Sequence, residues 1–182
     1  MMKIGIIVGS LRKKSWNRKI AKEVEKSFPD HVEAEWIDIS NLPFYNEDLD
    51  GDHPHDQYQA VRAALKKCDA YLFFTPEYNR SYAPAIKNVI DVGSRDPQGN
   101  PWAKKPAAIF SASMGGLGGM AGNHALRQAF IYVDLILMQQ PEVYLAHVDQ
   151  LFDENGSLNK DTKAFLAGAT QAFVDFAKKI LS

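Results

Sequence analysis

Short apolar runs alternate with longer amphipathic stretches along the whole chain. Five runs that are mostly apolar predict strands, at residues 3–8, 32–39, 70–75, 106–112 and within 135–145. Each run is followed by a stretch with helical periodicity, at residues 16–28, 56–67, 84–93, 121–133 and 161–181. The last helix has one apolar stripe, which we expect to pack against a sheet, formed by Phe165, Ala169, Ala172, Phe173, Phe176 and Ile180.

Five strand–helix units in succession predict an α/β fold. Parallel neighbours need crossover connections, and the helices supply them on both faces of the sheet. Five strands favour a flavodoxin-like doubly wound parallel sheet, and nothing divides residues 1–182 into more than one domain. Ligands of such sheets bind beyond the carboxyl ends of the strands, near the point where the strand order reverses. The loops after the first, third and fourth strands are therefore the candidate site.

Charge and cysteine content restrict the possible partners. Lys and Arg number 21 against 22 Asp and Glu, so the net charge of -1 gives no basic field for nucleic acid or an anionic membrane. Cys68 is the only cysteine, which leaves no internal disulfide and favours a reducing cytoplasm. The apolar run at 4–8 is too short for a signal peptide, and Asp134 interrupts the longest apolar stretch. We expect no membrane span.

The first candidate loop, GSLRKKSWN at 9–17, lies between a strand and a helix. A helix N-terminus presents free backbone N–H groups and partial positive charge, which together bind an anion. Ser10, Ser15 and Asn17 add hydrogen-bond donors, and Arg12 adds a two-pronged charged contact. The loop therefore predicts a site for a phosphate ester.

This loop has two other interpretations. A nucleotide triphosphate loop of the G-x-x-x-x-G-K-[ST] type needs Gly where Lys14 stands and Lys where Ser15 stands, so it is disfavoured. Alternatively, Ser15 only caps the helix and the neighbouring cations are solvated.

The second and third loops have different backbone properties. Residues 76–79 (PEYN) predict a rigid turn whose backbone can face a flat heterocycle, with Tyr78 beside it. For Glu77 the sequence leaves three roles open: a helix cap, a surface charge or a general base. Residues 111–123 are rich in glycine, which allows a ligand to approach the backbone closely. Within this loop, Gly116, Gly118 and Ala121 also fit a dinucleotide-binding fingerprint, although that fingerprint normally follows the first strand of its fold. A simple tight turn explains these glycines equally well.

Together the three loops resemble the NADPH-dependent FMN reductase family, which includes quinone, azo-dye and chromate reductases. The motifs that carry the resemblance are Gly9-Ser10-x-Arg12-x-x-Ser15-x-Asn17, Pro76-Glu77-Tyr78-Asn79 with Lys87-Asn88, and Ser113-x-Gly115-Gly116. The resemblance implies one bound FMN. Its phosphate site would be Ser10, Arg12, Ser15, Trp16 and Asn17; its ring would lie along Pro76, Glu77, Tyr78 and Asn79; and its other side would be closed by Ser113, Met114, Gly115 and Gly116.

The resemblance also implies a homodimer or homotetramer and NADPH or NADH as electron donor. We predict ping-pong transfer of electrons from the nicotinamide to a small acceptor, such as a quinone, azo compound, nitroaromatic, metal oxyanion or flavin. The flavin supplies the redox chemistry, so we predict no catalytic side chain and no metal ligand. Two alternatives remain: an electron carrier of the flavodoxin type that uses no nicotinamide, and an NAD(P)-binding dehydrogenase that uses the Gly116 loop.

Overall fold

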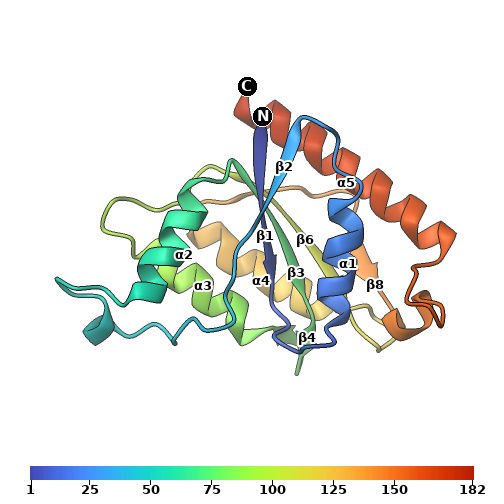
Figure 1. The fold of residues 1–182 in the computed structure, drawn as a ribbon, viewed down its shortest axis with the longest axis horizontal. Coiled ribbons are helices and arrows are strands. Elements are labelled where there is room, and N and C mark those ends of the chain that lie inside the picture. The colour runs from blue at the N-terminus through green and yellow to red at the C-terminus, as the bar shows by residue number, and fades with distance from the viewer.

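A computed structural model describes all residues, 1–182, and is built around one parallel sheet (Figure 1). The strand order is β2-β1-β3-β6, and two short strands, β7 and β8, both pair with the outer edge of β6. The strand bounds are β1 Met2–Val8, β2 Val32–Trp36, β3 Ala70–Thr75, β6 Pro106–Ala112, β7 Ile136–Leu137 and β8 Val143–Leu145. The predicted flavodoxin-like, doubly wound order is confirmed.

Two strands differ from the sequence-based prediction. The fifth position is divided into β7 and β8, because Pro141 between them has no N–H to donate to β6. Strand β2 ends at Trp36 rather than at residue 39, and the Asp38 side chain accepts a hydrogen bond from the Ser40 N–H at 2.9 Å. This local bond turns the chain out of the sheet.

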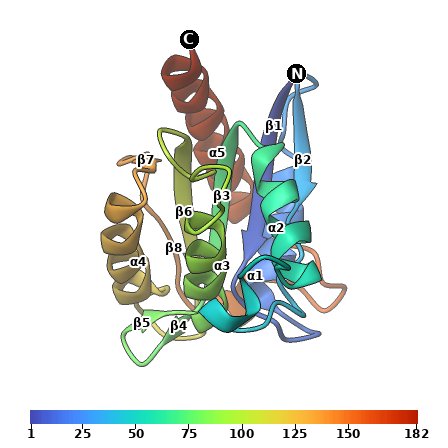
Figure 2. The same cartoon turned by 90° about the vertical axis from the view of Figure 1, so that its left-hand side faces the viewer.

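The helices form a layer on each face of the sheet (Figures 1 and 2). Helices α1 and α5 enclose one apolar core against the sheet, and α2, α3 and α4 enclose the other. Their bounds are α1 Trp16–Glu25, α2 Asp56–Lys66, α3 Pro84–Ser94, α4 Met120–Tyr132 and α5 Lys160–Leu181, with 3-10 turns η1 Glu47–Leu49 and η2 Val148–Leu151. None of the helices has the length and apolar content that crossing a bilayer requires.

The buried stripe of α5 agrees with the prediction only in part: Ala169 and Phe173 are buried, whereas Ala172, Phe176 and Ile180 are half-buried. Phe165 is 43% exposed, and the adjacent Leu166 occupies the core instead. The buried residues of the helix are Leu166, Ala169, Thr170, Phe173, Val174 and Ala177. Thr170 is tolerated there because its hydroxyl donates to the Leu166 carbonyl at 2.7 Å.

A short hairpin follows β3, which the sequence predicted only as a turn. It consists of β4 (Glu77–Tyr78) and β5 (Ser81–Tyr82). The connecting residues Asn79 and Arg80 have φ angles of 50° and 67°. Two positive φ values in succession are typical of a type I′ turn, which matches the twist of a hairpin. The hairpin lies beneath α4 at the carboxyl edge of the sheet (Figure 2).

Candidate functional site

The loops after β1, β3 and β6 meet at the carboxyl edge of the sheet, opposite the end where both chain termini lie (Figure 1). They enclose a pocket of about 210 Å³. Most of the residues predicted for the site line it, together with two that the sequence did not single out: Ser10, Arg12, Trp16, Asn17, Pro76, Glu77, Tyr78, Ala112, Ser113, Met114 and Val148. We call this the loop pocket.

No sequence motif indicates the two additional residues, Ala112 and Val148. Ala112 is the last residue of a buried strand, and Val148 follows the strand at the sheet's edge. The doubly wound topology brings the end of the fifth strand beside the fourth, and only this topology indicates Val148. Ser15, Asn79, Gly115 and Gly116 belong to the same loops but do not line this pocket.

In the first loop, the Ser15 hydroxyl caps α1 by accepting a hydrogen bond from the Arg18 N–H at 3.1 Å. This confirms the capping role, and the hydroxyl proton remains free to donate to a ligand. The first turn of α1 contains no acidic residue. Arg12 is exposed and forms no ion pair or hydrogen bond within the chain. The edge of the pocket therefore keeps its positive potential.

Asn17 connects the first loop to the third. It is 3% exposed, and its Nδ2 donates to the Ala112 carbonyl at 3.1 Å. Its Oδ1 is buried and has no hydrogen-bond partner in the protein. A buried acceptor without a partner is costly unless a ligand satisfies it. A ligand hydroxyl group could donate a hydrogen bond to this oxygen. An ionised phosphate oxygen could not, because it is itself an acceptor.

The second loop is fixed to helix α4. The Glu77 carboxylate accepts a hydrogen bond from the Gly122 N–H at 3.1 Å. The N-cap residue of α4, Gly119, has no side chain to perform this function, so Glu77 supplies the cap from another element. Of the three roles expected for Glu77, the structure shows the helix cap. Tyr78 is 44% exposed, and its hydroxyl has no hydrogen-bond partner in the protein.

The glycines of the third loop fall into two groups. Gly118 and Gly119 have φ angles of 58° and 81°, and a Cβ at Gly118 would lie 2.6 Å from the Tyr144 carbonyl carbon. These two glycines are required by the turn itself. A Cβ at Gly115 or Gly116 would meet no atom closer than 3.6 Å. The turn does not require glycine at those two positions, and the space beside their backbone is open.

The loop that contains these glycines follows β6, the fourth of the sheet's main strands in the chain, and starts α4. The positive end of α1, where a phosphate is expected, lies at a different loop. A dinucleotide fold places both features in its first strand–helix unit, so the Gly116-x-Gly118 match has no dinucleotide context here. No group of three or more His, Cys, Asp or Glu side chains is placed to hold a metal ion.

Comparison with known proteins places the chain in a family. The model for the NADPH-dependent FMN reductase family matches residues 2–150. A Pseudomonas putida protein named quinone reductase is 43% identical over 94% of this chain and 90% of its own. A Burkholderia protein named 2-hydroxy-1,4-benzoquinone reductase is 36% identical, covering 96% of this chain and 93% of its own.

A solved structure supports the same assignment. FerB from Paracoccus denitrificans, described as a flavoenzyme NAD(P)H:(acceptor) oxidoreductase, superposes with a TM-score of 0.90. It is 36% identical, and the match covers 98% of each chain. The similarity thus extends over the three loops and the whole sheet that carries them. The chain belongs to the NADPH-dependent FMN reductase family.

Proposed function

We propose that this protein is an FMN-dependent oxidoreductase that passes electrons from NAD(P)H to a small acceptor. Family membership supports this function over the two alternatives, because the matched family and its relatives are named for nicotinamide- or quinone-dependent reduction. The near-neutral net charge of -1 also differs from the acidic surface that helps electron carriers dock on basic partners.

The loop pocket fits the polar half of FMN. The N-terminus of α1, Ser10, Ser15 and Arg12 offer positive charge and donors to a phosphate. The buried Oδ1 of Asn17 offers an acceptor to a ribityl hydroxyl, and this unpaired oxygen is the observation that carries the assignment. At about 210 Å³ the pocket holds only part of an FMN molecule, so the ring would extend out of it along Tyr78 and Gly115–Gly116.

Bound FMN supplies the two-electron chemistry, which no side chain of the site can perform. The protein's contribution is binding and orientation. Arg12 and the α1 N-terminus would balance the charge of the phosphate, and the Glu77–Gly122 bond holds the hairpin along which the ring would lie. We propose ping-pong kinetics, because the nicotinamide and the acceptor must each approach the same exposed ring surface. No acid–base side chain is assigned.

Three further properties are predictions. Assembly into a homodimer or homotetramer is supported by the exposed apolar residues of the third loop and α4, among them Met114, Leu117 and Ile131. A cytoplasmic location is supported by the single buried cysteine. The acceptor is a small molecule.

FMN titration of the apoprotein, followed by quenching of flavin fluorescence, tests the binding site. Arg12→Ala should weaken FMN binding roughly tenfold, the value of one charge-assisted contact. Lys179→Ala, which removes an exposed cation near the end of α5, is the matched control and should leave the affinity unchanged. Equal dissociation constants for wild type and Arg12→Ala would refute the phosphate site. NADPH oxidation that does not require FMN would refute the function.

A further inference from the structure

A segment between β2 and α2, residues 42–46, is held in place by two side chains from helices. Asn88 of α3 accepts a hydrogen bond from the Tyr45 N–H at 2.7 Å and donates to the Pro43 carbonyl at 2.8 Å and the Leu42 carbonyl at 3.3 Å. Tyr58 of α2 donates its hydroxyl proton to the Phe44 carbonyl at 2.7 Å. We call residues 42–46 the strap.

These bonds fix the strap without any strand pairing. Tyr58 also accepts from the Asn46 N–H at 3.1 Å, and its ring stacks on Tyr45 at a centroid distance of 5.9 Å. Asn88 is 6% exposed and Tyr58 is completely buried, so both anchors are rigid. The strap is therefore held in one conformation by the helices beneath it.

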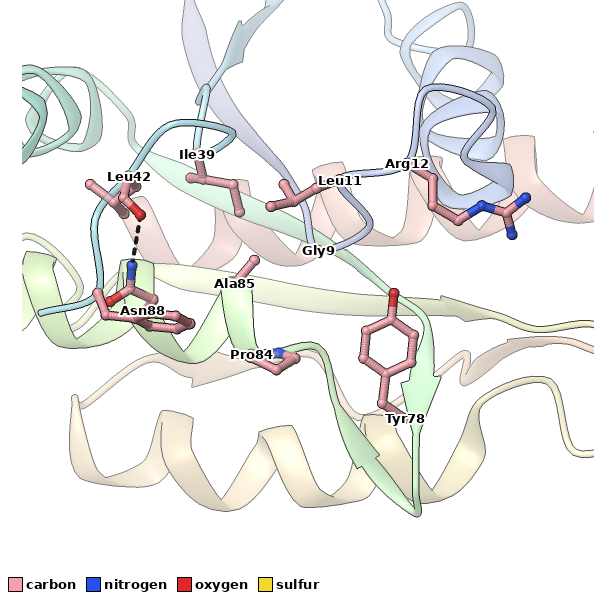
Figure 3. A pocket seen from close by; sticks show the side chains of 10 residues that line it. Gly9, Leu11, Arg12, Ile39, Leu42, Tyr78, Pro84, Ala85 and Asn88 are labelled. Carbon is pink, nitrogen blue, oxygen red and sulfur yellow. Dashed lines mark hydrogen bonds between the residues drawn. The ribbon is translucent and has the colours of Figure 1, made fainter.

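Against this fixed backbone, the Phe44 side chain is 75% exposed. It lines a pocket of about 540 Å³, which we call the strap pocket. Apolar side chains such as Leu11, Ile39 and Leu42 converge there (Figure 3). The lining consists of Gly9, Leu11, Arg12, Ile39, Leu42, Phe44, Tyr78, Pro84, Ala85 and Asn88. A rigid, exposed phenyl group beside an apolar pocket presents a preformed surface for another flat apolar group.

The polar side chains of the strap pocket lie on two sides, with Asn88 on one and Arg12 and Tyr78 on the other (Figure 3). The Asn88 amide is fully engaged by the strap, so it offers a ligand nothing. The Tyr78 hydroxyl rises toward the first loop at the opposite side of the pocket (Figure 3). A ligand that fits this distribution is a flat apolar ring with an oxygen at one edge.

The strap pocket adjoins the loop pocket. Arg12 and Tyr78 line both, so a ligand in the strap pocket lies next to the proposed flavin site. The volume of about 540 Å³ is ample for a one- or two-ring aromatic molecule.

We propose that the strap pocket binds the electron acceptor, with Phe44 as the residue that favours a flat aromatic acceptor such as a quinone over a compact ionic one, and Asn88 as the residue that positions Phe44. This inference rests on the proposed function. Leu42 and Phe44 would pack on the quinone ring, and the Tyr78 hydroxyl would donate to one quinone oxygen. The overall reaction is balanced: NAD(P)H, a proton and the quinone give NAD(P)⁺ and the hydroquinone, with two electrons transferred and solvent supplying the proton.

Two acceptors that differ in shape test the proposal on the FMN-loaded enzyme. One is 2-methyl-1,4-naphthoquinone. The other is ferricyanide, a hydrophilic inorganic anion that gains no binding energy from packing against apolar side chains. Phe44→Ala should lower kcat/KM for the naphthoquinone about tenfold, as expected for losing one apolar face of a pocket, and leave kcat/KM for ferricyanide unchanged. Phe44→Leu should retain most of the activity. Phe165→Ala, which removes another exposed phenyl group, is the matched control.

Asn88→Ala removes the hydrogen bonds that hold the strap. It should raise the KM for the naphthoquinone and leave kcat/KM for ferricyanide unchanged. FMN affinity, measured for each variant, separates the two pockets. Weaker FMN binding by Phe44→Ala would show that the strap pocket holds the flavin and would overturn the proposal. Equal loss with both acceptors, or no loss with either, would also overturn it. A wild-type enzyme that takes up FMN but is reduced by neither NADPH nor NADH would instead refute the proposed function.

Discussion

Glu77 and Gly122 join two elements that are far apart in the sequence: the Gly122 N–H donates to the Glu77 carboxylate at 3.1 Å. A Cβ at position 122 would lie 2.9 Å from the Ser81 carbonyl oxygen, so the glycine allows the hairpin to rest directly on α4. The capping bond and this close approach together place Tyr78 between the loop pocket and the strap pocket.

Loss of the Glu77 cap should destabilise the protein. Glu77→Ala removes the acceptor at the start of α4, and the expected loss is about 1 kcal/mol of unfolding free energy in urea. Glu77→Gln retains an acceptor oxygen and should lose less than half of that. An unchanged denaturation midpoint in Glu77→Ala would show that the bond contributes nothing.

Arg80 occupies a backbone conformation that favours glycine. Its φ is 67°, and its side chain is exposed. Arg80→Gly should therefore raise the unfolding free energy by about 1 kcal/mol, whereas Arg80→Ala retains the strained φ and should gain nothing. The pair of variants also separates strain from charge, because both remove the guanidinium and only Arg80→Gly relieves the strain. Equal stability of the two variants would contradict the role of strain.

Two buried asparagines that bond to the same strand provide a matched comparison. Asn17 donates to the Ala112 carbonyl and Asn123 to the Ile109 carbonyl, each at 3.1 Å. Replacing either by Ala should cost roughly 1–3 kcal/mol of stability, because a buried carbonyl loses its partner. Only Asn17→Ala should also weaken FMN binding, by about tenfold, since only Asn17 faces the loop pocket.

Fluorescence titration with FMN, performed well below the unfolding midpoint of both variants, makes this comparison. Similar FMN affinities for Asn17→Ala and Asn123→Ala would mean that the unpaired Asn17 oxygen has no part in binding the cofactor.

Cys68 should be unreactive in the folded protein. Burial raises the pKa of its thiol to about 12, and the thiol proton points to the Ala64 carbonyl at 3.4 Å. The thiolate is the reactive form, and at pH 7.5 almost none is present below such a pKa. A disulfide reagent should modify one thiol in urea and none in the native state. Rapid modification of the native protein would contradict this burial.

Hydrophobic periodicity was sufficient to predict the order of strands and helices, because the central strands are continuously buried and the helices have one apolar face. It was insufficient where local bonds decide the path. The turn at Asp38 and Ser40 shortens β2, and Pro141 divides the last strand. In α5, two adjacent apolar residues, Phe165 and Leu166, compete for the core, and periodicity did not indicate which one is buried.

The three loops of the site were predictable from topology, but the strap was not. Its sequence, LPFYN at 42–46, has no motif for ligand binding. Its importance arises from bonds to Asn88 and Tyr58, which lie 43 and 14 positions away from their strap partners. Such long-range side-chain-to-backbone contacts leave no periodic signal in the sequence.

Anaerobic reduction of the FMN-loaded protein tests the central claim most directly. The protein is mixed with one equivalent of NADPH, and separately with NADH, without oxygen, while the visible absorbance band of the flavin is followed. The account predicts that at least one nucleotide bleaches the band rapidly and that adding a quinone restores it. A flavin that binds but stays oxidised with both nucleotides, or a protein that takes up no FMN, would contradict the account.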